Sequence, residues 1–168
     1  LDRGSKFHLR SARRWPAVSV KNPPVQIQAT TLDVLDRTEI LSRDLSGVVQ
    51  KLERARVVCV GVGSLGSTIA LQLARSGVAH LTLIDPDHLV SANLGRHVLG
   101  VDDLGLPKAK ALQKQIRKDL PTTEVMAFAT FSEAVMHKNP EVFDKADLVV
   151  VTTADWQSEV ALWRAKSD

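Results

Sequence analysis

Short apolar runs alternate with amphipathic stretches along the chain after residue 55. Four runs, at residues 57–60, 81–84, 125–129 and 148–151, are apolar over most of their length and lie next to turn or polar residues. Runs of this length and composition are typical of strands that are buried on both faces of a parallel sheet. We therefore predict four buried strands.

The stretches between these runs carry apolar residues at helical spacing. Leu65, Ile69 and Leu73 form one stripe, and the helix is expected to end at Gly77, a natural left-handed cap. A second stripe follows Pro107 and consists of Leu112, Ile116 and Leu120, and residues 132–143 predict a short helix interrupted at Pro140. Alternating strands and helices predict an α/β fold, a Rossmann-like doubly wound and mainly parallel sheet with flanking helices.

Composition narrows the functional classes. Residues 1–21 carry a net charge of +5, so the rest of the chain carries −2 of the total of +3, and no basic surface for nucleic acid is predicted. The single cysteine, Cys59, lies within the first predicted strand, where packing is its expected role. No apolar run is long enough for a membrane span or a signal core, so we expect a cytoplasmic protein.

The charge distribution also suggests how the chain is divided. The basic, proline-containing residues 1–29 predict a linker or the tail of a preceding domain. Residues 30–168 predict one folded domain that is incomplete at its C-terminus.

The first predicted strand leads directly into Gly61-x-Gly63-x-x-Gly66 and then into a helix. In this setting Gly61 permits a tight turn, Gly63 lets a phosphate approach the backbone, and Gly66 lets the helix pack against the strand. The helix N-terminus favours an anion. Asp85 follows the second predicted strand, where a carboxylate can hold a ribose; a solvated turn residue before Pro86 is the alternative.

Three polar residues after Asp85 bear on whether the predicted nucleotide is ATP or NAD. Asn93 and Arg96 come shortly after it, and Lys108 falls in the first turn of the helix that opens at Pro107. A lysine there opposes the helix dipole unless an anion joins it, and a triphosphate is such an anion. Each cation taken alone is better explained as an ordinary surface side chain. Together with the glycine turn and Asp85, they favour ATP over NAD.

From Arg56 to Lys108 the chain resembles the adenylation core of the ThiF/MoeB/HesA and ubiquitin-activating-enzyme family. The resemblance rests on the three glycines, on Leu81-Thr-Leu-Ile-Asp85-x-Asp87, on Asn93-Leu-x-Arg96 and on Gly105-x-Pro-Lys108. It implies ATP-dependent adenylation of a carboxylate, usually the C-terminal glycine of a ubiquitin-like or sulfur-carrier protein. It also implies a homodimer, and magnesium as cofactor. The basic, proline-containing lead-in fits a multidomain fusion as the other expected arrangement.

Residue roles follow from the same resemblance. Gly61, Gly63, Gly66, Asp85 and Asp87 belong to the implied nucleotide site, with Asp85 on the ribose. Asn93, Arg96 and Lys108 are expected at the phosphates, and Arg96 and Lys108 are the catalytic candidates, since they neutralise charge on the phosphoryl oxygens. The implied magnesium ligand is Asp155; N-capping of the helix that follows is its alternative.

The chain also departs from the family pattern. Ser64 replaces a glycine that is common in the loop, and His97 replaces a glutamine that often follows the arginine. A local hydrogen-bonding role is expected for His97. The family's Cys-x-x-Cys zinc motifs and thioester cysteine are not found in this sequence. Two alternatives therefore stay open, an NAD-dependent dehydrogenase and a non-catalytic partner of a heterodimeric activating enzyme.

Overall fold

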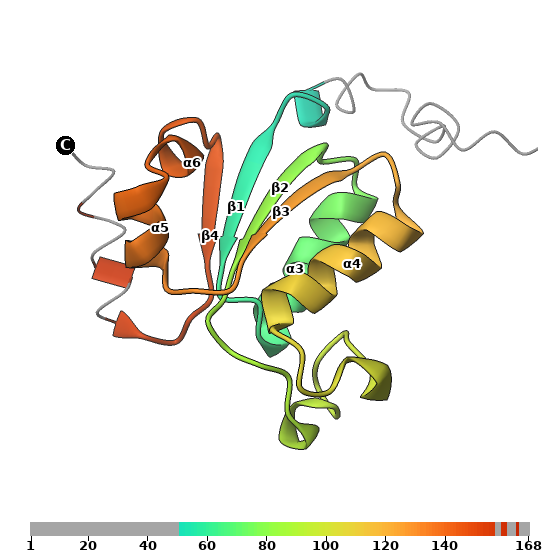
Figure 1. The fold of residues 1–168 in the computed structure, drawn as a ribbon. Helices are drawn as coiled ribbons and strands as arrows, with labels where there is room; N and C mark the ends of the chain where they lie inside the picture. The colour runs from blue at the N-terminus through green and yellow to red at the C-terminus, as the bar shows by residue number, and fades with distance from the viewer. Residues whose placement is uncertain (1–50, 157–158, 161–163, 165–168) are drawn as a thin grey trace, which may run out of the picture. The chain divides into compact units, whose positions relative to one another are not determined.

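The computed structural model describes residues 51–156, 159–160 and 164 of the 168-residue chain (Figure 1). All of them belong to one compact unit, Val34–Asp168. The predicted division between residues 29 and 30 lies outside the described residues. Within the described part, no helix combines the length and the apolar character that a membrane span requires.

The centre of the fold is a parallel sheet of four strands in the order β3-β2-β1-β4. The strands are β1 (Arg56–Val60), β2 (His80–Ile84), β3 (Glu124–Phe128) and β4 (Leu148–Val151). In the shared register, Cys59 of β1 lies opposite Leu83 of β2 and Val150 of β4. All four strands predicted from the sequence are present, with bounds that shift by one residue at most.

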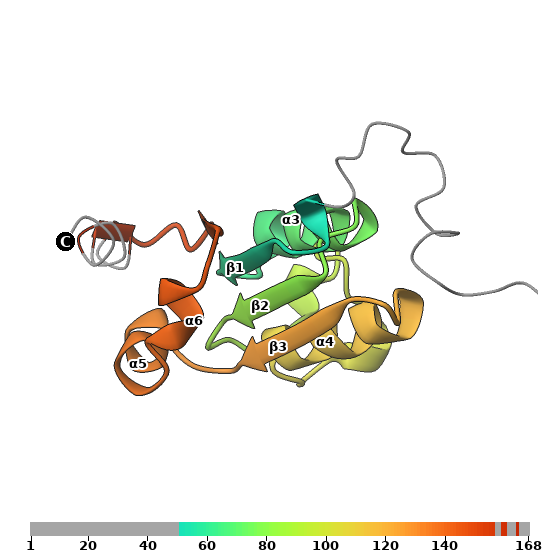
Figure 2. The same ribbon diagram turned by 90° about the horizontal axis from the view of Figure 1, so that it is seen from above.

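Helices cover both faces of this sheet (Figures 1 and 2). One face carries α3 (Ser64–Arg75) and α4 (Lys108–Asp119), and the other carries α5 (Ser132–Lys138) and α6 (Glu141–Asp144). Two short 3-10 turns, η1 (Ser91–Asn93) and η2 (Val101–Asp103), lie in the connection between β2 and α4. The doubly wound parallel fold predicted from the sequence is confirmed, including the interruption between α5 and α6 at Pro140.

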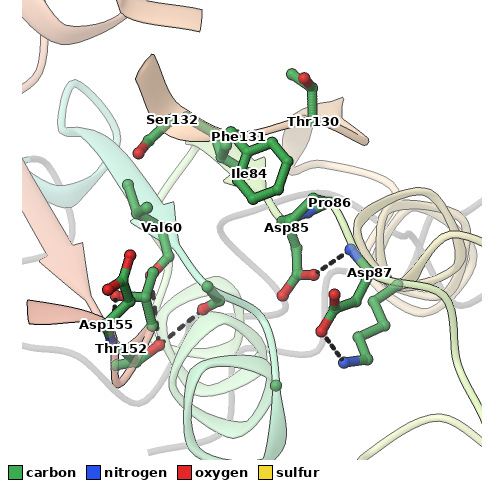
Figure 3. A pocket seen from close by; sticks show the side chains of 14 residues that line it. Val60, Ile84, Asp85, Pro86, Asp87, Thr130, Phe131, Ser132, Thr152 and Asp155 are labelled. Carbon is green, nitrogen blue, oxygen red and sulfur yellow. Dashed lines mark hydrogen bonds and ion pairs between the residues drawn. The ribbon is translucent and has the colours of Figure 1, made fainter. Parts of the chain in front are cut away.

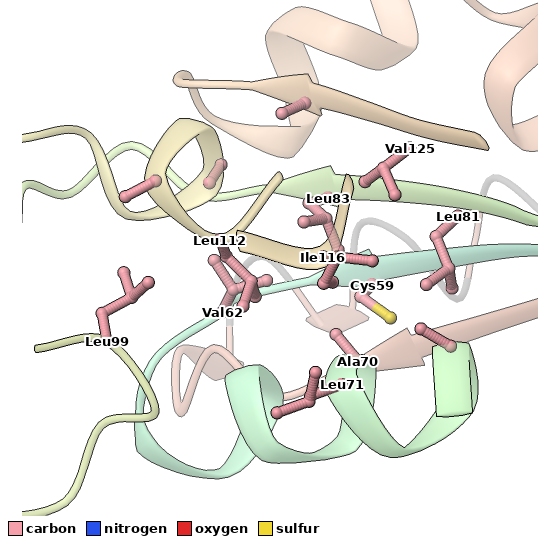
Figure 4. Close-up of a cluster of buried hydrophobic side chains, with 14 of the residues drawn as sticks. Cys59, Val62, Ala70, Leu71, Leu81, Leu83, Leu99, Leu112, Ile116 and Val125 are labelled. Carbon is pink, nitrogen blue, oxygen red and sulfur yellow. The ribbon is translucent and has the colours of Figure 1, made fainter. Parts of the chain in front are cut away.

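Each face of the sheet has its own apolar core. The larger core lies between the sheet and the α3–α4 layer and includes Cys59, Leu83, Leu112 and Ile116 (Figure 4). The smaller core contains Val58, Val60, Ile84 and Val135 under α5 and α6. Burial raises the pKa of the Cys59 thiol to about 12, so this thiol is a packing group, as predicted.

The buried face of α3 differs from the predicted stripe. Leu65 is 63% exposed, and Ile69 and Leu73 are only half-buried. The buried face consists instead of smaller residues around one leucine, namely Gly66, Ser67, Ala70, Leu71 and Ala74. The helix approaches β1 closely at Gly66, so small side chains fit against the strand and the larger ones are turned away. Spacing predicted the helix, but the size of the side chains decided which face is buried.

The ends of the two long helices follow the sequence signals. Gly77 has φ of 101°, its N–H donates to the carbonyl of Ala74, and the N–H of Val78 donates to the carbonyl of Leu73. These two hydrogen bonds form the glycine-dependent helix termination that Gly77 predicted. Helix α4 begins at Lys108, with Pro107 immediately before it, so Lys108 lies in the first turn as expected.

Strand β3 lies at the edge of the sheet that the described residues form, and α4 covers its outer carbonyl groups. Lys110 donates to the carbonyl of Ala127, while Gln113 and Arg117 both donate to the carbonyl of Val125. Side chains of a helix therefore bind acceptors that a neighbouring strand would otherwise use.

Candidate nucleotide-binding site

A pocket of about 230 Å³ lies at the carboxyl edge of the sheet (Figure 3). Residues from the ends of all four strands line it. Six residues of the predicted site are among them: Gly61, Gly63, Asp85, Asp87, Lys108 and Asp155. In a sheet of this order, β1 and β4 flank the point at which the direction of winding reverses, and this is where such folds bind ligands. The pocket therefore lies where the fold predicts a site.

The glycine turn forms one wall of the pocket. Gly61 has φ of 81°, and its N–H donates to the carbonyl of Ile84 at 2.8 Å. A Cβ on Gly66 would overlap the carbonyl of Gly61 and the hydroxyl of Thr152, so only glycine allows α3 to approach β1 this closely. A Cβ on Gly63 would meet no atom within 4 Å. Gly66 therefore serves packing, and Gly63 leaves backbone open toward a ligand.

Asp85 is almost fully buried, with 5% of its surface exposed. Its Oδ2 accepts from the N–H of Val62 at 2.7 Å, and its Oδ1 accepts from the N–H of Asp87 at 2.8 Å. The carboxylate thus ties the glycine turn to the segment after β2 and is not a solvated turn residue. Each oxygen can accept a further hydrogen bond. Its contact with a ribose stays a prediction.

Lys108 and Asp87 form an ion pair at the rim of the pocket. The ammonium lies 2.8 Å from Oδ2 of Asp87, and the backbone N–H of Lys108 donates to the carbonyl of Asp87 at 2.9 Å. The side chain of Lys108 is 9% exposed and that of Asp87 is 65% exposed. The sequence argument assigned the required anion to a triphosphate, but the chain supplies an anion of its own in Asp87. Lys108 is therefore held in place before any ligand binds.

Asn93 and Arg96 do not line the pocket. Oδ1 of Asn93 accepts from the N–H of Val90 at 3.1 Å, which closes the turn at η1. The side chain of Arg96 is exposed, while its backbone carbonyl accepts from the hydroxyl of Ser64 at 2.9 Å. The backbone of Arg96 is thus joined to the first residue of α3. The phosphate contacts expected of these two residues stay predictions.

His97 has the local hydrogen-bonding role that the sequence predicted. Its Nε2 lies 2.7 Å from the carbonyl of Val62, and its Nδ1 accepts from the N–H of Leu99 at 3.1 Å. Burial is the main cause that lowers the pKa of His97 below its ordinary value of 6.5, and the charge of Lys108 adds to this effect. The imidazole is therefore neutral at pH 7 and carries its proton on Nε2.

Asp155 lies on the β4 side of the pocket (Figure 3). Its N–H donates to the hydroxyl of Thr153 at 3.3 Å, and its carbonyl accepts from the N–H of Glu159 at 3.1 Å. It therefore takes the position before the first helical residue, as its capping alternative requires. Within the described ranges, no group of three His, Cys, Asp or Glu side chains could hold a metal ion. The magnesium role of Asp155 stays a prediction.

Eight lining residues were not predicted as site residues: Val60, Ile84 and Pro86 of the first two strand ends, and Thr130, Phe131, Ser132, Thr152 and Thr153. The last five follow β3 and β4, so their position after two predicted strands was the signal available for finding them. Thr152 links two walls of the site, because its hydroxyl donates to the carbonyl of Gly61 at 2.7 Å. Phe131 is 64% exposed although it lines the pocket.

A parallel sheet of this strand order, with a glycine turn and a buried aspartate at its carboxyl edge, is typical of Rossmann-like α/β domains that bind nucleotides. A model of the ThiF family matches residues 35–165. The chain belongs to the ThiF family.

Individual relatives agree with this assignment. The probable molybdopterin-synthase adenylyltransferase of Porphyra purpurea is 32% identical over 110 residues, which cover 65% of this chain and 28% of that protein. Ubiquitin-like modifier-activating enzyme 5 of Aedes aegypti is 26% identical over 162 residues, covering 87% of this chain and 41% of that enzyme. The chain therefore spans less than half of the length of either relative.

A solved structure shows the same fold. The crystal structure of E. coli MccB with ATP is 30% identical to this chain and superposes with a TM-score of 0.60. The match covers 69% of this chain and 34% of MccB.

Proposed function

We propose that this chain is the nucleotide-binding part of an enzyme that uses ATP to adenylate a carboxylate. The observation that carries the proposal is the buried ammonium of Lys108 at the rim of a pocket that also contains the open backbone of Gly63. A dinucleotide is held mainly by backbone amides, whereas a triphosphate that reacts at its α-phosphorus needs fixed cations. Membership of the ThiF family and the ATP complex of MccB support the same choice over a dehydrogenase.

In the proposed reaction a carboxylate oxygen attacks the α-phosphorus of ATP. A bond forms between that oxygen and the phosphorus, and the bond between the α-phosphorus and the bridging oxygen breaks, which releases pyrophosphate. The nucleophile is already ionised, so no side chain needs to remove a proton. The chain's contribution is to position the nucleotide and to neutralise the charge that builds up on the phosphoryl oxygens.

The residues of the pocket divide this work. The backbone around Gly63 and the N-terminus of α3 receive phosphate oxygens, because nothing occupies the space beside Gly63. Asp85 already fixes the glycine turn through Val62 and accepts the ribose hydroxyls with its remaining lone pairs. Lys108, held by Asp87, meets the negative charge from the α4 side.

The donor set at the pocket also suits magnesium. Mg²⁺ is usually bound by one or two carboxylates together with substrate phosphates, and the carboxylates of Asp87 and Asp155 both line the pocket. When bound, the ion would neutralise phosphate charge. We assign Asp155 as its ligand, while Asp87 lies on the opposite side of the pocket beside Lys108 (Figure 3).

For the acceptor, we propose the C-terminal carboxylate of a ubiquitin-like or sulfur-carrier protein. The names of the two relatives, a molybdopterin-synthase adenylyltransferase and a ubiquitin-like modifier-activating enzyme, support this class. We also propose that the adenylation domain begins near residue 30 and acts within a homodimer or a multidomain protein. A non-catalytic partner subunit is the remaining alternative, and the retained Arg96, Lys108 and Asp155 count against it.

Pyrophosphate exchange into ATP by the full-length protein tests this proposal, with a panel of ubiquitin-like and sulfur-carrier tails as acceptors. Lys108→Met removes the charge but keeps the apolar stem, and Asp155→Asn removes the proposed magnesium ligand; both should reduce exchange at least a hundredfold, the size of effect that loss of one electrostatic group gives. Lys118→Ala and Asp144→Asn, which change exposed residues, are the matched controls. Absence of exchange with every acceptor, together with measurable NAD binding, would overturn the proposal.

A further inference from the structure

Two hydrogen bonds join the segment that carries Arg96 to the glycine turn. The hydroxyl of Ser64 donates to the carbonyl of Arg96 at 2.9 Å, and Nε2 of His97 donates to the carbonyl of Val62 at 2.7 Å. The bonded residues lie 32 and 35 positions apart in the chain. Both donors are residues at which this chain departs from the pattern it resembles. We call residues 93–97 the arginine segment.

The two hydrogen bonds hold the two residues that share the peptide unit between Arg96 and His97. Ser64 holds the carbonyl of Arg96 itself, and His97 is the next residue along the chain. The N–H of Leu99 donates to Nδ1 of His97, so the neutral ring is held from both sides. The arginine segment therefore has its backbone fixed against the start of α3, while the side chain of Arg96 points into solvent.

We propose that Ser64 and His97 are positioning residues, which hold the arginine segment on the glycine turn so that Arg96 reaches the phosphates of a nucleotide bound there. The proposal rests on the function proposed above. Among the described residues, no hydrogen bond or ion pair holds the guanidinium of Arg96. A long, unpaired side chain loses much rotamer freedom when it binds a ligand, so a fixed backbone limits the entropy that remains to be lost.

The neutral state of His97 supports this arrangement. A proton on Nδ1 would remove the acceptor that the N–H of Leu99 uses, so only the neutral ring makes both bonds. Burial and the charge of Lys108 keep the pKa of His97 low, whereas the carbonyl of Val62 and the charges of Asp85 and Asp103 oppose that shift. Glutamine can donate and accept at the same two places but does not titrate near neutral pH.

The test is a set of double-mutant cycles on ATP affinity, measured by equilibrium dialysis of the full-length protein. Ser64→Ala and His97→Ala should each weaken ATP binding about fivefold, the effect expected for loss of one hydrogen bond. In an Arg96→Ala background the same substitutions should have almost no further effect, because the residues act through Arg96. His97→Gln should bind ATP with most of the affinity that His97→Ala loses. Thr68→Ala, which removes a hydroxyl that bonds only within α3, is the matched control.

Hydrogen exchange of the backbone amides gives a second readout that needs no nucleotide. Ser64→Ala and His97→Ala should speed exchange in residues 93–99, and Thr68→Ala should not. Unchanged exchange in this segment, or an equal loss of ATP affinity with and without Arg96, would overturn the inference. These readouts are independent of pyrophosphate exchange: a protein that binds ATP but adenylates no acceptor contradicts the proposed function and leaves the positioning role supported.

Discussion

Substitution by alanine should have different effects at two glycines of the same motif: Gly66→Ala should lower the stability of the fold, and Gly63→Ala should weaken ATP binding. In Gly66→Ala the new methyl group would overlap the carbonyl of Gly61 and the hydroxyl of Thr152, and it would lie 2.9 Å from the carbonyl carbon of Gly61. Two of these three contacts are to backbone, which cannot move without shifting β1 or α3. In Gly63→Ala the methyl group would meet no atom within 4 Å, and Gly63 itself lines the pocket.

The magnitudes follow from these contacts. Overpacking of this kind costs ~3 kcal/mol, at the upper end of the usual range, since backbone is involved. Loss of the bond from Thr152 to the carbonyl of Gly61 adds ~1 kcal/mol. The better helix propensity of alanine returns ~1 kcal/mol, so Gly66→Ala should lose ~3 kcal/mol of unfolding free energy. Gly63→Ala changes a helix N-cap only, for which the cost is ~1 kcal/mol or less.

Equilibrium urea unfolding by circular dichroism and ATP binding by dialysis separate the two effects. Gly66→Ala should lower the urea midpoint by about 1 M or more, given the usual dependence of unfolding free energy on urea. Gly63→Ala should keep its midpoint within about 0.5 M of the unsubstituted protein and bind ATP at least tenfold more weakly, because the methyl group blocks close approach of a phosphate. A Gly66→Ala protein as stable as the unsubstituted one would refute the close contact between α3 and β1.

Three further predictions use other parts of the site and core. Asp87→Asn leaves the buried ammonium of Lys108 without its carboxylate and should lower the free energy of unfolding, measured in urea, by ~1 kcal/mol. The value is modest because Asp87 is largely exposed. Saturating ATP should reduce this loss of stability. Cys59, with a pKa of about 12, should stay unlabelled by iodoacetamide at pH 8 until the protein unfolds, and rapid labelling of the native protein would contradict its burial. The pKa of His97 is lower in the folded protein than in the unfolded chain, so as the pH falls the unfolded chain takes up this proton first. The free energy of unfolding should therefore fall as the pH drops from 6.5 to the folded pKa. Urea unfolding of His97→Gln at the same pH values should lack this decrease.

The fold could be predicted from the sequence largely because its two hydrophobic patterns are strong: short apolar runs for the strands and apolar residues at helical spacing for the helices. The strand runs lie between helical stripes, and parallel strands joined by helices allow few other arrangements. The face of α3 could not be predicted, because the close approach at Gly66 favours small side chains over the larger Leu65. Helix periodicity records the direction of side chains but not the distance to the neighbouring strand.

The candidate site was predicted where residues follow a strand or begin a helix. Gly61, Asp85 and Lys108 line one pocket, as their places in the sequence implied. The pairing of Lys108 with Asp87 was not predicted, because it depends on how the connection after β2 turns back toward α4. The position of the Arg96 side chain could not be predicted either, since an exposed arginine takes its final position only when a partner is present.

The contacts from α4 to β3 have a consequence beyond the site. An open edge strand offers unpaired carbonyl and amide groups to any extended chain that comes near, and this is a common route to aggregation. Lys110, Gln113 and Arg117 bind the outer carbonyls of Val125 and Ala127, and they bring cationic charge to that edge. A second molecule would have to displace these side chains before it could add a strand to β3. The helix that supplies Lys108 to the pocket thus also protects the sheet against self-association.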